Sequence, residues 1–432
     1  MSSSTYLPLY LGVGAAAIAL HLLMRRRRER GNAEARAEAD QAGLNEPPSL
    51  HPVVNPVRCI GSGGCVSACP EGALGIVDGR ATLINASACI GHGACAEACP
   101  VEAITLVFGT EKRGVDIPKV SPQFESNVPG IFIAGELGGM GLIRKAASQG
   151  VQAVDAIRRR KAGPDELDLL IVGAGPAGLG AALAAQEKGL RYAVIEQEDS
   201  LGGAIYHYPR AKIAMTAPVR LPLVGSVRMS EVSKEKLLDF WHGIVGKTGL
   251  VLRFNERMDR IEPQGESFVI HTSQGQHRAR SVLLAIGRRG SPRKLGVPGE
   301  ELQKVVYRLI DAEQYRGQQV MVVGGGDSAL EAALQLAEQP GTTVQLSYRS
   351  QAFSRVKPKN RSALEAAAAA GRLELLLQTE IERITPDAVS LRGSSGLLTR
   401  PNDALIVCAG GVLPTALLQQ MGIAFETKHG EA

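Results

Sequence analysis

The sequence predicts an α/β protein in which two strand–loop–helix–strand motifs follow a small cysteine-rich domain and an apolar N-terminal helix. Three features carry this prediction: two glycine-rich loops, two cysteine runs thirty residues apart, and a long stretch without charge near the start. The 432 residues suffice for about three domains of ordinary size. A net charge of +5 is mild, so we expect no nucleic-acid partner.

The N-terminal stretch "TYLPLYLGVGAAAIALHLLM" (5–24) carries no charge and is followed at once by four arginines. About 20 residues at about 1.5 Å each span the roughly 30 Å of bilayer hydrocarbon, and basic residues favour the cytoplasmic side. We therefore expect residues 1–24 to form a transmembrane helix that passes once through the cell membrane. A charged linker over 25–50 and the soluble part would then lie in the cytoplasm. A second interpretation is an apolar helix packed on the body of the protein.

Six of the seven cysteines fall in two similar runs, "CIGSGGCVSACP" (59–70) and "CIGHGACAEACP" (89–100). Such clustering predicts metal binding in a reducing compartment, because a disulfide framework would scatter the cysteines. Both runs follow the iron–sulfur spacing C-x2-C-x2-C-x3-C-P, except that Ser62 and His92 stand where the second cysteine belongs. A short apolar strand is expected after each run, which makes the region an internal repeat.

Residues 51–110 thus resemble a bacterial dicluster ferredoxin domain, in which the fourth cysteine of each run serves the other cluster. The resemblance implies a first ligand set of Cys59, Cys65 and Cys99 with Ser62 at the vacant place. It implies a second ligand set of Cys89, Cys95 and Cys69 with His92 at the vacant place.

The type of the two clusters stays open between 4Fe-4S and 3Fe-4S. A serine alkoxide is a hard ligand that forms reluctantly, so a three-iron cluster is plausible beside Ser62. A neutral imidazole binds iron better and would raise the potential, as in Rieske centres. The remaining alternative is that one or both sites stay empty.

The stretch "LDLLIVGAGPAGLGAALAAQEKGLRYAVIEQ" (167–197) is expected to form a strand, a glycine loop, a helix and a second strand. Its three loop glycines permit a tight turn, a close approach to a pyrophosphate, and close helix–strand packing; they are Gly173, Gly175 and Gly178. Glu196 ends the second strand, where an acid accepts hydrogen bonds from a ribose. Residues 166–290 are therefore predicted to be a Rossmann-like dinucleotide-binding domain.

A second motif, "QQVMVVGGGDSALEAALQLAEQPGTTVQLSYR" (318–349), predicts a second Rossmann-like domain over 291–403. Its loop contributes Gly324, Gly326 and Ser328. Its second strand ends at Arg349 instead of an acid, and Arg355 follows. Arginine pairs with a ribose 2′-phosphate that an acid would repel, so NADPH is favoured over NADH. The alternative for both arginines is a solvated loop.

Two such domains in series are typical of two-dinucleotide flavoproteins, and 166–432 resemble the thioredoxin reductase-like family. The relatives include ferredoxin–NADP reductases and bacillithiol disulfide reductases. The resemblance implies FAD in the first domain, with Gly202 and Gly203 beside it, and NADPH in the second. It implies that 404–432 return to the FAD domain, and it makes a homodimer possible. The C-x-x-C pair of thioredoxin reductases is absent, and Cys408 lies alone in a strand expected to be buried.

The segment "NVPGIFIAGELGGMGLIRKAASQGVQAVDAI" (127–157) resembles the piece that ends the FAD domain in this family, yet here it precedes the first glycine loop. We interpret residues 111–160 as that piece, moved by circular permutation, which neighbouring termini make tolerable. Gly135 and Glu136 would then lie near the flavin end of FAD. The alternative is an unrelated linker.

These predictions combine into a membrane-anchored FAD-dependent NAD(P)H oxidoreductase that moves electrons between NADPH, FAD and ferredoxin-type clusters. Its partner would be an electron-donor or electron-acceptor protein, or a small redox substrate. Hydride transfer needs no acid or base from a side chain, so no catalytic residue is named. Three alternatives remain: a bacillithiol-type disulfide reductase with accessory clusters, an electron-transfer subunit of a larger partner, and a non-enzymatic iron–sulfur redox sensor.

Overall fold

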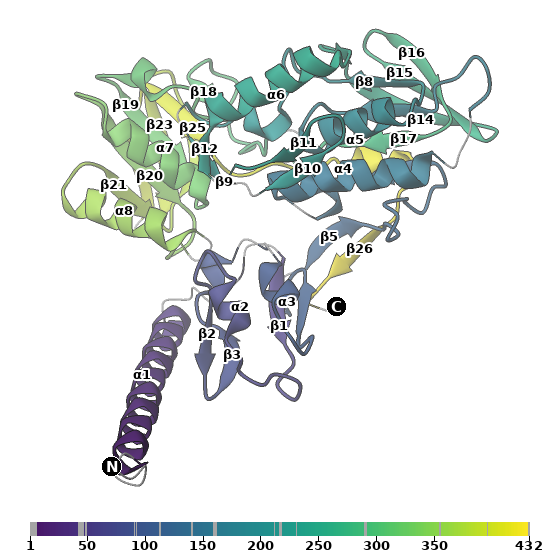
Figure 1. Cartoon of the computed structure of the whole chain (residues 1–432). Coiled ribbons are helices and arrows are strands. Elements are labelled where there is room, and N and C mark those ends of the chain that lie inside the picture. The colour runs from purple at the N-terminus through teal and green to yellow at the C-terminus, as the bar shows by residue number, and fades with distance from the viewer. Residues whose placement is uncertain are drawn as a thin grey trace. The chain divides into compact units, whose positions relative to one another are not determined.

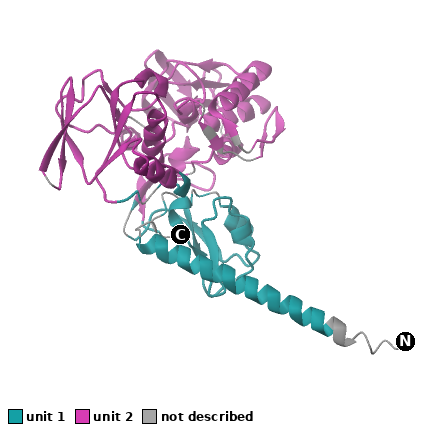
Figure 2. Ribbon diagram, turned by 90° about the vertical axis from the view of Figure 1, so that its left-hand side faces the viewer, with its two compact units in different colours: residues 1–114, 352–359, 429–432 teal, residues 115–351, 360–428 magenta. Residues whose placement is uncertain are grey.

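The computed structural model divides into two compact units, shown in Figure 2. Unit 1 takes in residues of 1–114, 352–359 and 429–432, and unit 2 takes in residues of 115–351 and 360–428. The structure describes residues 7–41, 47, 50–89, 91, 93–111, 114–139, 141–158, 162–210, 212–215, 218–229, 231–288, 292–353, 356–394 and 396–430.

Unit 1 holds the cysteine-rich domain, which is built twice from one pattern. A turn of helix follows each cysteine run's glycines: α2 (Gly64–Ser67) and α3 (Ala94–Glu97). The strands are β1 (His51–Val54), β2 (Leu74–Val77), β3 (Arg80–Leu83) and β4 (Ile104–Val107), with the short helix η2 (Ala86–Ala88) between the last two. β1 pairs antiparallel with β4, and β2 forms a hairpin with β3. Asp78 and Gly79 turn this hairpin, both with positive φ, as a tight two-residue loop requires.

The N-terminal helix α1 (Leu7–Gln41) is 35 residues long (Figure 1). It runs on through the arginines into the region expected to be a linker, because Arg, Glu and Ala are good helix formers. Asn32 Nδ2 donates to the Ile76 carbonyl at 2.9 Å, so the later part of α1 lies against β2. Within the described residues, no helix has the length and apolar character needed to cross a membrane. The transmembrane helix expected over 1–24 is therefore not confirmed.

Unit 2 contains a first parallel sheet in the order β13-β8-β7-β17-β6. Its strands are β6 (Ile131–Ile133), β7 (Leu169–Val172), β8 (Tyr192–Ile195), β13 (Leu252–Arg253) and β17 (Val282–Leu284). β6 comes before the first glycine loop in the chain, yet it forms the edge of this sheet, with Leu283 opposite Phe132. The segment that we interpreted as permuted is thus an integral part of the first sheet.

Two helices that precede and follow the first glycine loop cross closely: α4 (Ile143–Ile157) and α5 (Pro176–Glu187). A Cβ on Gly150 of α4 would overlap the Ala177 carbonyl, and a Cβ on Gly180 of α5 would overlap that of Ala147. Glycine is needed at both positions because the two backbones touch there. Nine of the twelve residues of α5 are buried as a result.

Further elements surround the first sheet. Three strand pairs are two-stranded: β5 (Val115–Pro118) with β26 (Phe425–Lys428), β9 (Ile213–Met215) with β12 (Glu231–Ser233), and β10 (Val219–Leu221) with β11 (Gly225–Val227). A three-stranded meander consists of β14 (Met258–Gln264), β15 (Ser267–Thr272) and β16 (Gly275–Ala279). The remaining element is the helix α6 (Lys234–Thr248). α6 is capped at its start by the Ser233 hydroxyl and ends at Gly249 in the left-handed region.

A second parallel sheet runs in the order β18-β25-β19-β20-β21. Its strands are β18 (Val305–Val306), β19 (Gln319–Val323), β20 (Thr343–Tyr348), β21 (Glu374–Leu377) and β25 (Ala404–Val407). The helices are α7 (Asp327–Ala337) and α8 (Pro358–Ala369), and a separate antiparallel sheet comprises β22 (Glu380–Ile384), β23 (Ala388–Gly393) and β24 (Gly396–Pro401).

The strand β25 corrects one expected boundary. Residues 404–407 belong to the second sheet, where β25 pairs with both β18 and β19, and do not begin the return to the first domain. The unbroken apolar run "ALIV" fits a strand buried on both faces of a parallel sheet. The return comes later, with α9 (Thr415–Gln420): Leu418 and Met421 join the core of the first sheet around Leu170.

Candidate cofactor sites

The first glycine loop lies where the carboxyl ends of three neighbouring parallel strands meet, a usual place for a dinucleotide. Gly173 has a φ of +106°, and a Cβ there would lie 2.6 Å from the Ala285 carbonyl oxygen that follows β17. A Cβ on Gly178 would overlap the Gly173 carbonyl. Gly175 faces Gly203, with 3.7 Å between its ideal Cβ and the Gly203 Cα. Gly202 joins these four glycines through its amide, which donates to the Ala174 carbonyl at 2.9 Å, so the five come together around one loop.

Glu196 follows β8 and is buried, with only 6% of its surface exposed. Its Oε2 accepts a hydrogen bond from the Ala174 amide at 2.7 Å, and its Oε1 accepts from the Glu198 amide at 3.1 Å. Burial raises the pKa of this carboxyl, while the two amides act in the opposite direction. Sequence reasoning gave Glu196 a ribose partner, but missed that the carboxylate also binds the backbone of the glycine loop.

Gly135 and Glu136 approach the same edge of the first sheet from β6. Gly135 has a φ of +85°, and its amide donates to Gln149 Oε1 of α4 at 2.8 Å. Glu136 begins the short helix η3 (Glu136–Gly138), and its carboxylate faces the backbone of Gly287 after β17. Burial lowers the pKa of the neighbouring Arg288, and the charge of Glu136 counters that effect. Gln149 was not predicted; a polar residue on the buried side of α4 was the only signal.

The loop around His207 connects the first sheet with the second within unit 2. Arg308 contacts His207 Nδ1, and His207 Nε2 lies 3.3 Å from Glu198 Oε1. Lys212 Nζ lies 2.7 Å from Glu331 Oε2 of α7. These partners are about 100 residues apart in the chain, and neither pair was predicted.

The second glycine loop follows β19. A Cβ on Gly324 would overlap the Cys408 carbonyl that follows β25, and Gly325 faces the ring of Tyr348 in the same way. Gly326 caps α7, and Ser328 lies in the first turn of that helix. Cys408, expected to be buried in a strand, is only half-buried and lies just beyond one.

Two arginines, Arg349 and Arg355, were predicted to bind the 2′-phosphate of NADPH. Arg349 follows β20, is exposed, and forms no ion pair among the residues that the structure describes. Within that part of the chain, no carboxylate neutralises the charge that a phosphate would meet. Arg355 lies outside the described residues.

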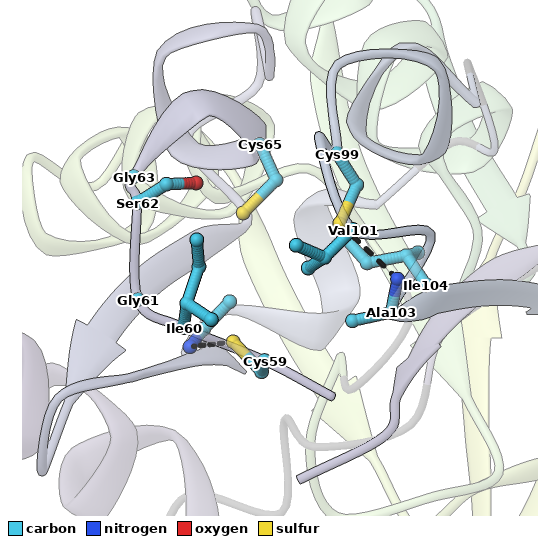
Figure 3. Close-up of a pocket in the computed structure, with 11 residues that line it drawn as sticks. Cys59, Ile60, Gly61, Ser62, Gly63, Cys65, Cys99, Val101, Ala103 and Ile104 are labelled. Atoms are coloured by element: carbon cyan, nitrogen blue, oxygen red, sulfur yellow. Dashed lines mark hydrogen bonds between the residues drawn. The ribbon is translucent and has the colours of Figure 1, made fainter. Parts of the chain in front are cut away.

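A first cavity in unit 1 gathers the thiols of Cys59, Cys65 and Cys99 (Figure 3). Ser62 lines its rim, and Ile104 and Ala81 line its wall. The Cys59 sulfur accepts from the Ala81 amide at 3.4 Å, and the Cys99 sulfur accepts from the Ala103 amide at 3.2 Å. These are the three cysteines that the resemblance assigned to the first cluster.

A second cavity gathers Cys69, Cys89 and Cys95, the set assigned to the second cluster. Each triad draws cysteines from both runs, because α2 and α3 pack against each other and bring the fourth cysteine of one run to the other cavity. All seven cysteines are free of disulfides. His92 lies outside the described residues.

Residues 170–431 match the family described as pyridine nucleotide-disulphide oxidoreductase, and residues 51–100 match the 4Fe-4S dicluster domain. The chain belongs to the pyridine nucleotide-disulphide oxidoreductase family. The resemblance drawn from the glycine loops and from the cysteine runs is thereby confirmed, and so is the expected enzyme class, an FAD-dependent oxidoreductase.

A bacilliredoxin reductase and several ferredoxin–NADP reductases are among the relatives of this oxidoreductase. Bacilliredoxin reductase Bdr of Bacillus subtilis is 27% identical over 267 residues, which are 60% of this chain and 82% of that protein. A ferredoxin–NADP reductase of Thermus thermophilus is 31% identical over 274 residues, 61% of this chain and 78% of that protein. The solved structure of bacillithiol disulfide reductase Bdr from Bacillus cereus is 26% identical, with a TM-score of 0.54, and covers 59% of this chain and 81% of its own.

The residues of the oxidoreductase are suited to bind the cofactors that its family implies, which are FAD, NADP(H) and iron–sulfur clusters. The first loop offers backbone amides at a helix start and no Cβ where a pyrophosphate would approach, and the second loop has Arg349 nearby. In unit 1, burial raises the pKa of the Cys65 and Cys95 thiols, and raises that of Cys89 to about 11; neighbouring cysteines add to each shift. Buried thiols that repel one another as thiolates are suited to bound iron, whose positive charge reverses both effects.

Each cavity contains the three cysteines that the resemblance assigned to one cluster. Among the residues that the structure describes, no three His, Cys, Asp or Glu side chains converge closely enough to hold one metal ion. A cubane cluster does not need that convergence, because each cysteine binds a different iron of the cluster.

Proposed function

We propose that this protein is an NADPH-dependent reductase that delivers electrons through two iron–sulfur clusters to a protein or to a small redox acceptor. One observation carries the proposal: the six clustered cysteines of unit 1 sort into two separate triads, and the same chain carries two dinucleotide loops in unit 2. No C-x-x-C pair precedes the second glycine loop, so the usual dithiol acceptor of thioredoxin reductases is missing.

The side chains of each site would have distinct tasks. The first loop and Glu196 would hold the adenosine half of FAD, with Gly135 and Glu136 beside its flavin end. Arg349 would select the 2′-phosphate of NADPH. Bound FAD accepts a hydride from a nicotinamide and releases its two electrons singly, which is the chemistry needed to connect NADPH with iron–sulfur clusters. The cysteine triads would hold those clusters in cavities with apolar walls.

The test is to purify the protein anaerobically, count iron and flavin per chain, and record electron paramagnetic resonance (EPR) spectra before and after adding NADPH. We expect iron and flavin together, and a cluster signal that grows when NADPH bleaches the flavin. Cys69→Ala should lose iron from the second cavity, while Ser67→Ala, at the end of α2 two residues before it, should not. Flavin that bleaches in a protein without iron would refute the proposal.

A second function is favoured by the similarity to bacillithiol disulfide reductase. In that case the protein reduces a low-molecular-weight disulfide at the flavin, and the clusters are accessory. NADPH-dependent disulfide reduction would then survive Cys59→Ala, whereas the first function requires that the variant lose electron transfer to its acceptor.

We also propose that α1 associates with a lipid membrane. The support is a run of exposed apolar side chains, Leu11, Ile18 and Leu23 at 66%, 63% and 57% exposure, followed directly by the four arginines. Membrane and soluble fractions of expressing cells, compared for the full chain and for a chain lacking residues 1–24, test this. Recovery of the full chain only in the soluble fraction would refute it.

A further inference from the structure

The first cavity is open at the corner where a fourth cysteine would complete the ligand set. Ser62 occupies that corner, and Figure 3 shows its side chain on the same side of the cavity as Cys65. Ser62 is exposed, and its hydroxyl has no hydrogen-bond partner among the described residues. The three cysteines, in contrast, are partly or fully buried.

The hydroxyl of Ser62 is chemically a poor ligand for the iron of a cluster. A serine oxygen binds iron well only as an alkoxide, and none of the described residues that line the first cavity has a basic side chain to take its proton. Iron–sulfur clusters also prefer soft sulfur donors to hard oxygen donors. The hydroxyl of Ser62 is therefore expected to stay neutral and unbound at ordinary pH.

The surroundings of Ser62 leave room for a molecule from solution. Gly61, Gly63 and Gly64 flank the corner, and a Cβ added at Gly63 would meet nothing within 4 Å. Ile60, which also lines the cavity, is 66% exposed. The corner is therefore open to solvent at Gly63, while Gly61 lies against the Gly79 carbonyl and Gly64 against that of Ala98.

We propose that the iron at this corner is an exchangeable site that takes a small external thiolate in place of the missing cysteine. The proposal rests on the proposed function, since it requires a cluster in the first cavity. Thiolate is the donor that the other three corners use, and it is the product class of disulfide reduction. Binding forms one iron–sulfur bond and releases solvent from the same iron, with no net electron transfer.

Three proteins test the proposal: the natural chain, Ser62→Cys and Ser62→Ala. Each is purified anaerobically, and EPR spectra and iron content are recorded with 2-mercaptoethanol or with ethylene glycol, which carries oxygen in place of the sulfur. The second cluster, common to all three, serves as the internal reference.

We expect the natural chain exposed briefly to air to show a three-iron signal and to lose about one iron per chain relative to Ser62→Cys. After ferrous iron and a reductant are added, only 2-mercaptoethanol should change its cluster spectrum. In Ser62→Cys the first cavity should show neither the three-iron signal nor a thiol response, because its own sulfur fills the corner; any signal of the second cluster is common to all three proteins and is subtracted. Ser62→Ala should match the natural chain.

Two results would overturn the proposal. A spectrum that changes in Ser62→Ala, with no response to thiol in the natural chain, would make Ser62 itself the ligand. Iron that is unaffected by Cys59→Ala would mean that the first cavity holds no cluster, so that the proposed function fails before the thiol experiment applies.

Discussion

The two glycine loops of unit 2 begin from similar sequences but differ in how tightly the backbone is enclosed. In the first, α5 is buried along nine of twelve residues, because α4 covers it. In the second, five of the eleven residues of α7 are buried, and the helix keeps an exposed face. The first loop accepts glycine alone at its third position, Gly178, whereas the second accommodates Ala329.

This difference suggests different tasks for the two loops. A loop enclosed on all sides suits a cofactor that stays bound through every turnover. A loop at the start of an amphipathic, half-exposed helix suits a cofactor that must enter and leave. The charged residues that follow the two motifs differ in the same way. The second strand of the first motif is followed by the buried Glu196, and that of the second motif by the exposed Arg349.

The largest effect is expected from Gly178→Ala. The new Cβ would overlap the Gly173 carbonyl in a buried loop, and such overpacking costs about 1–3 kcal/mol or more. We expect most of the bound flavin to be lost and the melting temperature to fall. The reverse change in the second loop, Ala329→Gly, should cost about 1 kcal/mol and leave flavin bound. Equal flavin loss in the two variants would contradict the view that the first loop alone holds a permanently bound cofactor.

A slightly smaller effect is expected where α4 crosses α5. Gly150→Ala would push a methyl group into the Ala177 carbonyl and separate the helices, at about 1–3 kcal/mol. Gly246→Ala is the control, because that glycine lies exposed in α6 with nothing within 4 Å of its ideal Cβ. The control should stabilise the protein by about 0.5–1 kcal/mol, since alanine favours a helix. Thermal unfolding of both variants measures the contrast, and a stabilising Gly150→Ala would show that the two helices do not touch.

Sequence patterns predicted the local features of these sites, but not the contacts between residues that are far apart in the chain. The glycine spacing and the acid after the first motif follow rules of short range and were predicted from them, whereas the two cysteine triads were implied by the resemblance to dicluster ferredoxins. The hydrogen bonds from Ala174 to Glu196 and from Gly135 to Gln149 join side chains to loops through the packed fold, which no periodicity reveals. The membership of β25 in the second sheet was not predicted for a similar reason, because the apolar sequence of a buried strand does not indicate which sheet it joins.

The charge difference between the loops predicts cofactor selectivity. Arg349→Gln should raise the KM for NADPH about tenfold, the loss of one charge-assisted hydrogen bond of about 1.4 kcal/mol, and leave the KM for NADH unchanged. Arg383→Gln removes the same charge from β22, outside the second sheet, and should change neither constant. Steady-state kinetics with both nucleotides measure the ratio. If NADPH and NADH weaken together, Arg349 does not read the 2′-phosphate.

The smallest effect concerns one of the contacts between the two glycine-loop domains of unit 2, that of Arg308 with His207. Arg308 is a donor only, so His207 must accept at Nδ1 and carry its proton at Nε2, toward Glu198. Burial lowers the pKa of His207 below its usual value of 6.5; the charges of Arg308 and Lys234 lower it further, and Glu198 opposes them.

The unfolded chain therefore binds the His207 proton at a higher pH than the folded chain does, so this contribution to stability is lost as the pH falls below about 6.5. Melting temperatures followed from about pH 7.5 down to 5.5 should fall more steeply in the natural chain than in His207→Gln. His242→Gln, an exposed histidine on α6, should keep the natural slope. Identical slopes in all three proteins would mean that the contact between Arg308 and His207 does not persist in solution, and that the two glycine-loop domains are coupled only through pairs such as Lys212 and Glu331.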